Sequence, residues 1–366
     1  IQTYFLSKAF NYLIRIVVFY FEPSLLDQDI LLMFFLGLNL IDWASFVVAI
    51  LLQTYLFSLG MIFNRKLIKF SAITVYSGML LFFFTVLLND VKFSTYVFVN
   101  SLNYDNFIVA DNLGPLVTVA GTVFAYFSIV ILNFGDFSRY TKNEIELKKG
   151  NFSLILNLII FSFFALFIVI GVDGFLKQNS DNLSRILTNP TDIIGSLDNL
   201  LITNLVLILI VIASASTNLI ANFIPSQYSL INLMPSYLSL KSASLVISIF
   251  GFIIGIFWLT YLSQIGILSF IDTFGAFFGP LFGIVICDYY FIKKRNLNNK
   301  DIYSLDNKGV YYYSGGWHIK GIYSLIIGFI FSSSTIWNSN LMFLQSYSWI
   351  IGLVIAGFVY FLLARK

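Results

Sequence analysis

The stretch at residues 200–223 reads LLITNLVLILIVIASASTNLIANF and decides the fold. Its first half is dominated by Leu, Ile and Val, and the whole stretch is long enough to cross a bilayer as a helix. Polar residues then appear inside the apolar span, as the run ASASTN at 213–218 and as Asn222. Hydrocarbon offers no water to these groups, so each must bond within the protein or bind a solute. The stretch therefore predicts a membrane-spanning helix that carries a polar site.

The rest of the chain has the composition of an integral membrane protein. Of its 366 residues, 58% are hydrophobic and only 11% are charged, whereas soluble domains carry about 25% charged residues. Cys287 is the only cysteine and His318 the only histidine, which excludes an internal disulfide and argues against a Cys- or His-ligated metal site. The apolar spans hold no paired carboxylates and no histidine, so the sequence predicts neither an enzyme nor, without a filter-like loop, a channel.

Ten apolar stretches are long enough, or nearly so, to span a membrane as helices, and they are too long for the strands of a membrane barrel. The predicted spans are 1–21, 43–62, 70–88, 115–134, 153–172, 200–223, 243–262, 267–292, 321–337 and 343–364. The connections between them are too short to hold a soluble domain. Residues 1–366 are therefore predicted to form a single transmembrane domain.

Lys and Arg predict the orientation of these spans. When the connections are sorted alternately into two sets, one set holds sixteen Lys and Arg residues and the other holds three. The basic set comprises 63–69, 135–152, 224–242, 293–320 and the C-terminal tail. Basic loops lie on the cytoplasmic side of a membrane. We therefore expect a multi-pass protein of the cell membrane, favouring a bacterial inner membrane, with a cytoplasmic C-terminus.

The first predicted span indicates that the chain begins inside a helix. Arg15 lies about 20 Å from Gln2 at the rise of a helix, and we expect its side chain to reach the outer interface. Gln2 would then lie near the middle of the bilayer. We expect the sequence to be an N-terminally truncated piece of a longer protein, inactive by itself.

The polar run in 200–223 has two overlapping faces. Ser214, Asn218 and Asn222 form one stripe at the spacing of successive helical turns. Ser and Thr hydroxyls near a small residue can supply oxygen ligands to a small hard cation, and a carboxamide can bind the amide edge of a ring. The alternative is helix packing, in which small residues allow close approach and hydroxyls bond back to the helix.

The stretch 115–140 places Phe127 near the membrane midplane, in the run Tyr126-Phe127-Ser128, where its ring could stack on a flat solute. Asp136 and Arg139 follow at the cytoplasmic edge, three residues apart and able to pair. Packing against lipid or another helix is the alternative for Phe127.

The stretch 267–292 is predicted to be a kinked helix that could act as a gate, because Gly275, Gly279 and Pro280 lie within one span. Asp272 lies near its outer end, and an intramembrane carboxylate is a candidate for carrying a proton or binding a cation. The alternative is a hydrated carboxylate at the outer interface.

Four runs together resemble the nucleobase–cation symporter family 1, which includes transporters of hydantoins, uracil, cytosine, allantoin and thiamine. They are NFGDFSRYTK (133–142), ASASTNLIAN (213–222), GPLFGIVICDYYFIKKR (279–295) and YYYSGGWHIKG (311–321). The resemblance covers essentially the whole chain. It implies an all-α membrane bundle of twelve helices built on a five-plus-five inverted repeat, in which the ten spans match the third to the twelfth helix.

The resemblance also implies roles for particular residues. Gln2 and Asn222 match residues that hydrogen-bond the substrate, and Phe127 falls where the family often has a stacking Trp. Relatives have Gly before that Trp, whereas this chain has Tyr126. Asn218, one turn before Asn222, completes the candidate substrate site. The eighth-helix half of a sodium site is implied for Ala213, Ser216 and Thr217, its other half lying on the family's first helix.

The resemblance therefore implies a symporter that imports a nucleobase, hydantoin, allantoin or similar heterocycle by alternating access. Coupling to Na⁺ or to H⁺ stays open, and no cofactor is expected beyond the coupling ion. Membrane lipid is the only other expected partner, and nucleic acid is not expected. The alternative is a transporter of the same fold that carries an amino acid or another small solute.

Overall fold

Helices make up the regular structure of the protein. A computed structural model describes residues 2–89, 113–179, 200–260, 267–302, 304 and 306–365. Within these ranges no strand is formed, and the extended pairings are two isolated bridges, Phe35 with Leu38 and Ser314 with Trp317. The predicted all-α class is confirmed.

The chain divides into two compact units, each assembled from two separate segments. The first unit comprises Ile1–Asn106 and Asp136–Ser263, and the second comprises Phe107–Gly135 and Gln264–Lys366. Neither unit is a contiguous half of the sequence, so each depends on contacts between distant segments.

Among the residues that the structure describes, the first unit contains six long helices and several short ones. Its elements are α1 (Gln2–Phe21), η1 (Pro23–Asp27), α2 (Asp29–Leu32), α3 (Leu40–Ser58), α4 (Met61–Asn89), α8 (Glu144–Asn179), α10 (Leu200–Asn218), the π-helix η4 (Leu219–Phe223), α11 (Ile224–Leu233) and α12 (Leu240–Thr260). The sequence boundary between the two units, Gly135 to Asp136, falls within the short helix α7 (Phe134–Ser138).

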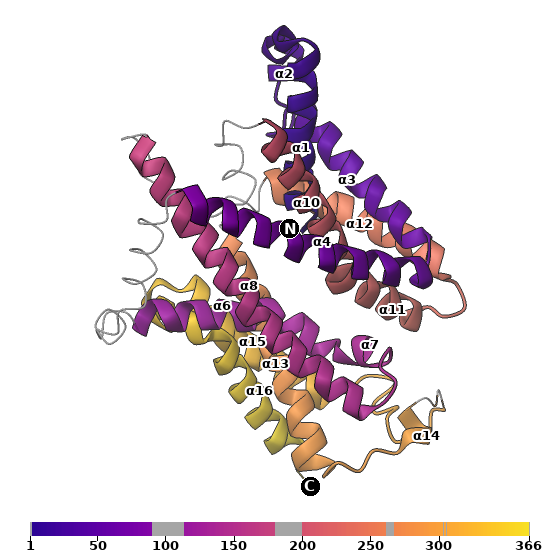
Figure 1. Ribbon diagram of the computed structural model, residues 1–366. Coiled ribbons are helices and arrows are strands. Elements are labelled where there is room, and N and C mark those ends of the chain that lie inside the picture. Colours follow the sequence, from indigo (N-terminus) through magenta and orange to yellow (C-terminus); the bar gives the residue numbers. More distant parts are fainter. Residues whose placement is uncertain are drawn as a thin grey trace. The chain divides into compact units, whose positions relative to one another are not determined.

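In the described part of the second unit there are four long helices. Its elements are α6 (Leu113–Leu132), α13 (Ile267–Ile286), the π-helix η6 (Cys287–Ile292), α14 (Asn299–Ile302), α15 (Ile319–Trp337), η7 (Ser339–Tyr347) and α16 (Ser348–Ala364). Within this unit α13 packs against α6, α15 and α16 (Figure 1).

Eight helical segments of the described residues are long and apolar enough to cross a membrane. Helices α1 and α4 correspond to the other two predicted spans, but they do not meet the same criterion of length, hydropathy and charge. The boundaries of several helices differ from the prediction, and α8 begins at Glu144 instead of at 153. The residues at 63–69, predicted to be a connection, lie inside α4, and the helix predicted to end at 223 continues through η4 and α11 to Leu233.

The core of the first unit joins α1, α3 and α10, which lie together in Figure 1. Leu6, Ala49 and Ala215 bury their side chains against one another, one from each helix. Ala9 packs similarly beside Leu207. Small residues let helix backbones approach closely in a membrane. This packing brings the beginning of α1 beside the polar end of α10.

The beginning of α15 is held by the single histidine of the chain. The Nδ1 atom of His318 accepts a hydrogen bond from the Gly321 amide at 2.8 Å, which caps the helix. Because Nδ1 accepts, the neutral ring carries its proton on Nε2. The Tyr360 hydroxyl lies 3.3 Å from Nε2 and donates to the Asp288 carboxylate at 2.7 Å. His318 therefore links α15, α16 and η6.

This cap predicts a pH-dependent stability. Burial lowers the pKa of His318 below its ordinary value of 6.5, although nearby Asp288 opposes the shift. The unfolded chain then binds the proton more tightly, so stability is lost as the pH falls through 6.5. Asn also caps helices and does not titrate. We expect His318→Asn to flatten the dependence of the thermal unfolding midpoint on pH between 7.5 and 5.5, measured in detergent. Equal slopes in both proteins would refute the assignment.

Candidate functional site

The polar end of α10 leads directly into a π-helical turn. Pro225, at the beginning of α11, has no N–H to donate to the carbonyl four residues earlier. The helix widens just before it, and the Ile224 amide bonds to the Leu219 carbonyl instead. Single π turns inside helices are frequent at functional sites. Asn222 lies within this turn and is exposed, whereas Asn218 is 3% exposed.

A chain of hydrogen bonds connects these two asparagines to α1 and α3. Asn222 Nδ2 donates to Asn218 Oδ1 at 2.6 Å, and Asn218 Nδ2 donates to Thr3 Oγ1 at 3.3 Å. The Thr3 hydroxyl then donates to Gln53 Oε1 at 3.2 Å. The prediction that Asn218 and Asn222 share a face of the helix is confirmed by their direct contact. The contribution of Thr3 and Gln53 was not predicted.

The three residues predicted to form half of a cation site also lie together. The carbonyl oxygen of Ala213 accepts a hydrogen bond from the Ser216 hydroxyl at 3.0 Å and from the Thr217 hydroxyl at 2.8 Å. Three oxygens thus converge within one helical turn, and each hydroxyl keeps lone pairs that could contact a cation. The same contacts are those of ordinary back-bonding within a helix. Their role as cation ligands stays a prediction.

The other two predicted substrate contacts lie on α1 and α6. Gln2 is the first residue of α1 and precedes Thr3, so it belongs to the first unit together with Asn222. Phe127 is half-buried on α6 in the second unit. Its ring meets that of Tyr126 edge to face, with centroids 5.3 Å apart. Stacking of Phe127 on a solute stays a prediction.

Asp272 is buried inside the second unit. It is 5% exposed, accepts from Gln345 Nε2 at 2.9 Å and lies 3.4 Å from the Thr122 hydroxyl. Both partners are neutral, and among the residues that the structure describes Asp272 has no ion-pair partner, which a buried carboxylate usually needs. The burial contradicts the alternative of a hydrated surface carboxylate. A role in carrying a proton stays a prediction.

The glycines of α13 serve close packing. Helix α13 runs unbroken through Pro280. A Cβ on Gly275 would collide with Ala125, and a Cβ on Gly279 would collide with the carbonyl oxygen of Trp349. These residues therefore let α13 approach α6 and α16 closely. The gate predicted for Gly275, Gly279 and Pro280 stays a prediction.

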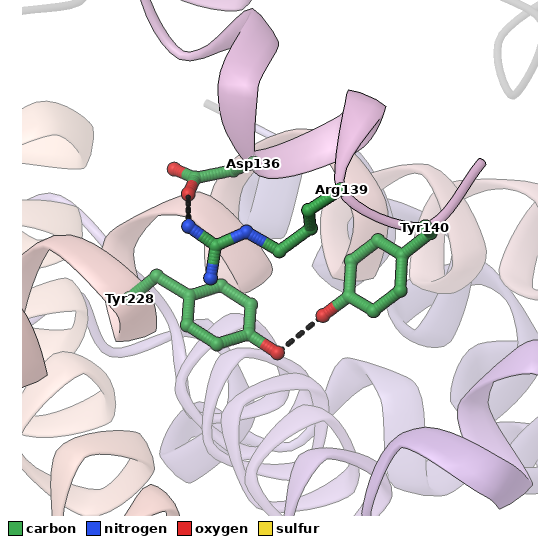
Figure 2. Close-up of polar contacts among 4 residues, drawn as sticks. All are labelled: Asp136, Arg139, Tyr140 and Tyr228. Atoms are coloured by element: carbon green, nitrogen blue, oxygen red, sulfur yellow. Dashed lines mark hydrogen bonds and ion pairs between the residues drawn. The ribbon is translucent and has the colours of Figure 1, made fainter. Parts of the chain in front are cut away.

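A cluster of charged and aromatic side chains joins the segment after α7 to α11 (Figure 2). Asp136 pairs with Arg139 at 2.8 Å, as predicted. The guanidinium of Arg139 lies over the ring of Tyr228, 4.4 Å from its centroid, and the hydroxyls of Tyr140 and Tyr228 share a hydrogen bond. Burial, followed by the contact with Tyr228, raises the pKa of Tyr140 well above its ordinary value. The hydrogen bond and the cation–π contact together join this segment to α11.

These features define an all-helical, multi-pass membrane protein with a polar site inside one of its spans, and the family model that its sequence matches is that of a permease. The particular family follows from comparison with known sequences. The chain belongs to the permeases for cytosine/purines, uracil, thiamine and allantoin, whose family model matches residues 1–352.

Two relatives show how far the sequence similarity extends. The purine-uracil permease NCS1 of Arabidopsis thaliana is 26% identical over 341 residues, which cover 90% of this chain and 55% of the relative. The allantoin permease of Bacillus subtilis is 25% identical over 257 residues, covering 70% of this chain and 50% of the relative. The chain thus spans about half the length of these relatives.

Solved structures of one transporter share the fold. Mhp1, a nucleobase-cation-symport-1 family transporter, in a closed conformation with bromovinylhydantoin bound, matches with a TM-score of 0.68 at 16% identity, over 98% of this chain and 70% of Mhp1. Its inward-facing conformation matches with a TM-score of 0.63 at 17% identity, over 100% of this chain and 71% of Mhp1. The predicted transporter fold is confirmed, whereas the numbering of its helices stays a prediction.

Proposed function

We propose that the complete protein is a secondary active transporter that imports a nucleobase or a related flat heterocycle such as allantoin or hydantoin. The observation that carries this proposal is the carboxamide of Asn222, exposed in a π turn and held from behind by the buried Asn218. A carboxamide offers a donor and an acceptor side by side, which suits the amide edge of such a ring. The substrates named for the purine-uracil, allantoin and hydantoin permeases support this class.

In this proposal Gln2 hydrogen-bonds the ring and Phe127 stacks on it. A coupling cation contacts the oxygens of Ala213, Ser216 and Thr217, which converge in the structure. The cation and the substrate can drive alternating access when both bind the same conformation of the transporter more tightly than the other. Each then shifts the equilibrium between the outward-open and inward-open conformations by the difference in its affinity for the two. Asp272 is the group proposed to carry charge if the ion is H⁺. We also propose that the protein lies in the cell membrane with its C-terminus in the cytoplasm.

Uptake by reconstituted protein tests this function. The complete protein in proteoliposomes is expected to accumulate at least one of labelled uracil, allantoin and hydantoin above its external concentration when a Na⁺ or H⁺ gradient is imposed. Collapsing that gradient with an ionophore should reduce accumulation to equilibration. Failure to take up every heterocycle under every gradient would contradict the proposal.

A further inference from the structure

Four polar side chains form a continuous path from the exposed Asn222 into the interior of the first unit. We call Asn222, Asn218, Thr3 and Gln53 the amide relay. It crosses three helices, because its members lie on α10 and η4, on α1 and on α3. Each link is a side-chain hydrogen bond of 2.6 to 3.3 Å. Since no member is ionised, the path depends on the direction of each hydrogen bond and not on charge.

The inner end of the relay is an amide that is only partly satisfied. Gln53 is 2% exposed, and its Nε2 atom has no hydrogen-bond partner among the residues that the structure describes. A buried donor without a partner costs free energy, and an apolar residue of similar size would avoid that cost. Packing alone therefore does not account for a glutamine at this position. Its one bonded atom, Oε1, accepts from Thr3.

The relay fixes the direction of every hydrogen bond along it. Gln53 Oε1 can only accept, so the Thr3 hydroxyl must donate its one proton to it, and any further hydrogen bond to this hydroxyl needs a donor. Asn218 meets that need by donating through Nδ2, and its Oδ1 is then left to accept from Asn222 Nδ2. The Nδ2 of Asn222 is thereby engaged inward. Its Oδ1 takes no part in the relay and is left to face outward as an acceptor, beside the second N–H of Nδ2.

We infer that Thr3 and Gln53 are positioning residues that set the hydrogen-bonding sense of Asn222. They present the Asn222 carbonyl to a ligand that carries a ring N–H, and they thereby select imide- and amide-type heterocycles. The inference rests on the proposed function, because it needs Asn222 to contact the ligand. Thr3 on α1 and Gln53 on α3 therefore act on specificity without contacting the ligand themselves.

Thr3→Val tests the relay in the complete protein, because it removes the hydroxyl while keeping the shape of the side chain. The probes are uracil and hydantoin, each paired with its N-methylated analogues. The readout is the ratio of the dissociation constant of the analogue to that of the parent compound. A site that bonds an N–H discriminates against the analogue that lacks it. Without the Thr3 hydroxyl, the carboxamide groups of Asn218 and Asn222 can flip, so that their oxygen and nitrogen atoms exchange places. We therefore expect the ratio to fall about tenfold, the effect of losing one oriented hydrogen bond.

Three further variants separate positioning from folding. Thr3→Ser keeps the hydroxyl and is expected to restore the wild-type ratio. Gln53→Met removes the terminal acceptor and is expected to lower the ratio as Thr3→Val does. Thr54→Val is the matched control, because Thr54 neighbours Gln53 and bonds to Ser248 outside the relay, and it should leave the ratio unchanged.

The outcomes distinguish the relay from the proposed function. An unchanged ratio in Thr3→Val, with wild-type binding intact, would overturn the relay and leave the proposed function standing. A fall that Thr3→Ser does not restore, or that Thr54→Val reproduces, would also overturn it. If the wild-type protein binds neither uracil nor hydantoin nor their analogues, the proposed function fails for these ligands and the relay fails with it.

Discussion

Replacing Asn222 with Ala is expected to weaken binding of the transported heterocycle by between about tenfold and a hundredfold. The carboxamide is exposed in the π turn and held by Asn218. Its loss removes hydrogen bonds to the ring and leaves ring polar groups unpaired, which costs about 1–3 kcal/mol, and each 1.4 kcal/mol is about tenfold in affinity. Equilibrium binding of labelled ligand to the purified protein measures the change.

Asn204 provides a matched control for this prediction. It is a carboxamide on the same helix, but its Nδ2 donates to the Leu200 carbonyl of its own helix. Asn204→Ala should therefore leave ligand affinity within twofold of wild type. Equal losses in the two variants would show a general effect on α10, and unchanged affinity in Asn222→Ala would remove Asn222 from the site.

Replacing Gly283 with Leu is expected to destabilise the second unit by about 3 kcal/mol, at the upper end of the usual cost of overpacking. A Cβ at this position would collide with the carbonyl oxygen of Leu353 on α16. Because the obstacle is backbone and not a flexible side chain, relief requires α13 and α16 to separate. Thermal unfolding in detergent should show a lower midpoint.

Gly251 is the control for this substitution. It lies within α12, where a Cβ would meet no atom within 4 Å. Gly251→Leu should leave the midpoint unchanged or raise it slightly, because it replaces a poor helix former on an open face. A similar fall of the unfolding midpoint in both variants would show that the destabilisation does not come from the close contact of α13 with α16.

Much of the fold could be predicted because the bilayer restricts the possible structures so strongly. Apolar length alone locates helices such as α3, α12 and α15, since only internally bonded segments can cross hydrocarbon. The predicted boundary at 223 was wrong because the helix continues past Pro225 into α11. Pro225 lies in the first turn of α11, where a missing N–H is tolerated. Just before it, the π turn supplies a wider hydrogen bond, from the Ile224 amide to the Leu219 carbonyl.

The candidate site was only partly predictable. Helical spacing was sufficient to bring Asn218 and Asn222 together, and to pair Asp136 with Arg139. Thr3 and Gln53 were missed, although an isolated carboxamide in the apolar run of α3 was a signal. Their partnership depends on which helices pack together, and 215 residues separate Thr3 from Asn218. No local pattern reports such a contact.

The central claim is that the polar end of α10 binds a flat heterocycle. Competition binding to the purified complete protein tests it most directly, with labelled uracil, allantoin and hydantoin displaced by each other, by alanine or by leucine. We predict saturable binding of at least one heterocycle, displaced by its relatives and not by either amino acid. Displacement by alanine or leucine, or no saturable binding of any heterocycle, would contradict the claim.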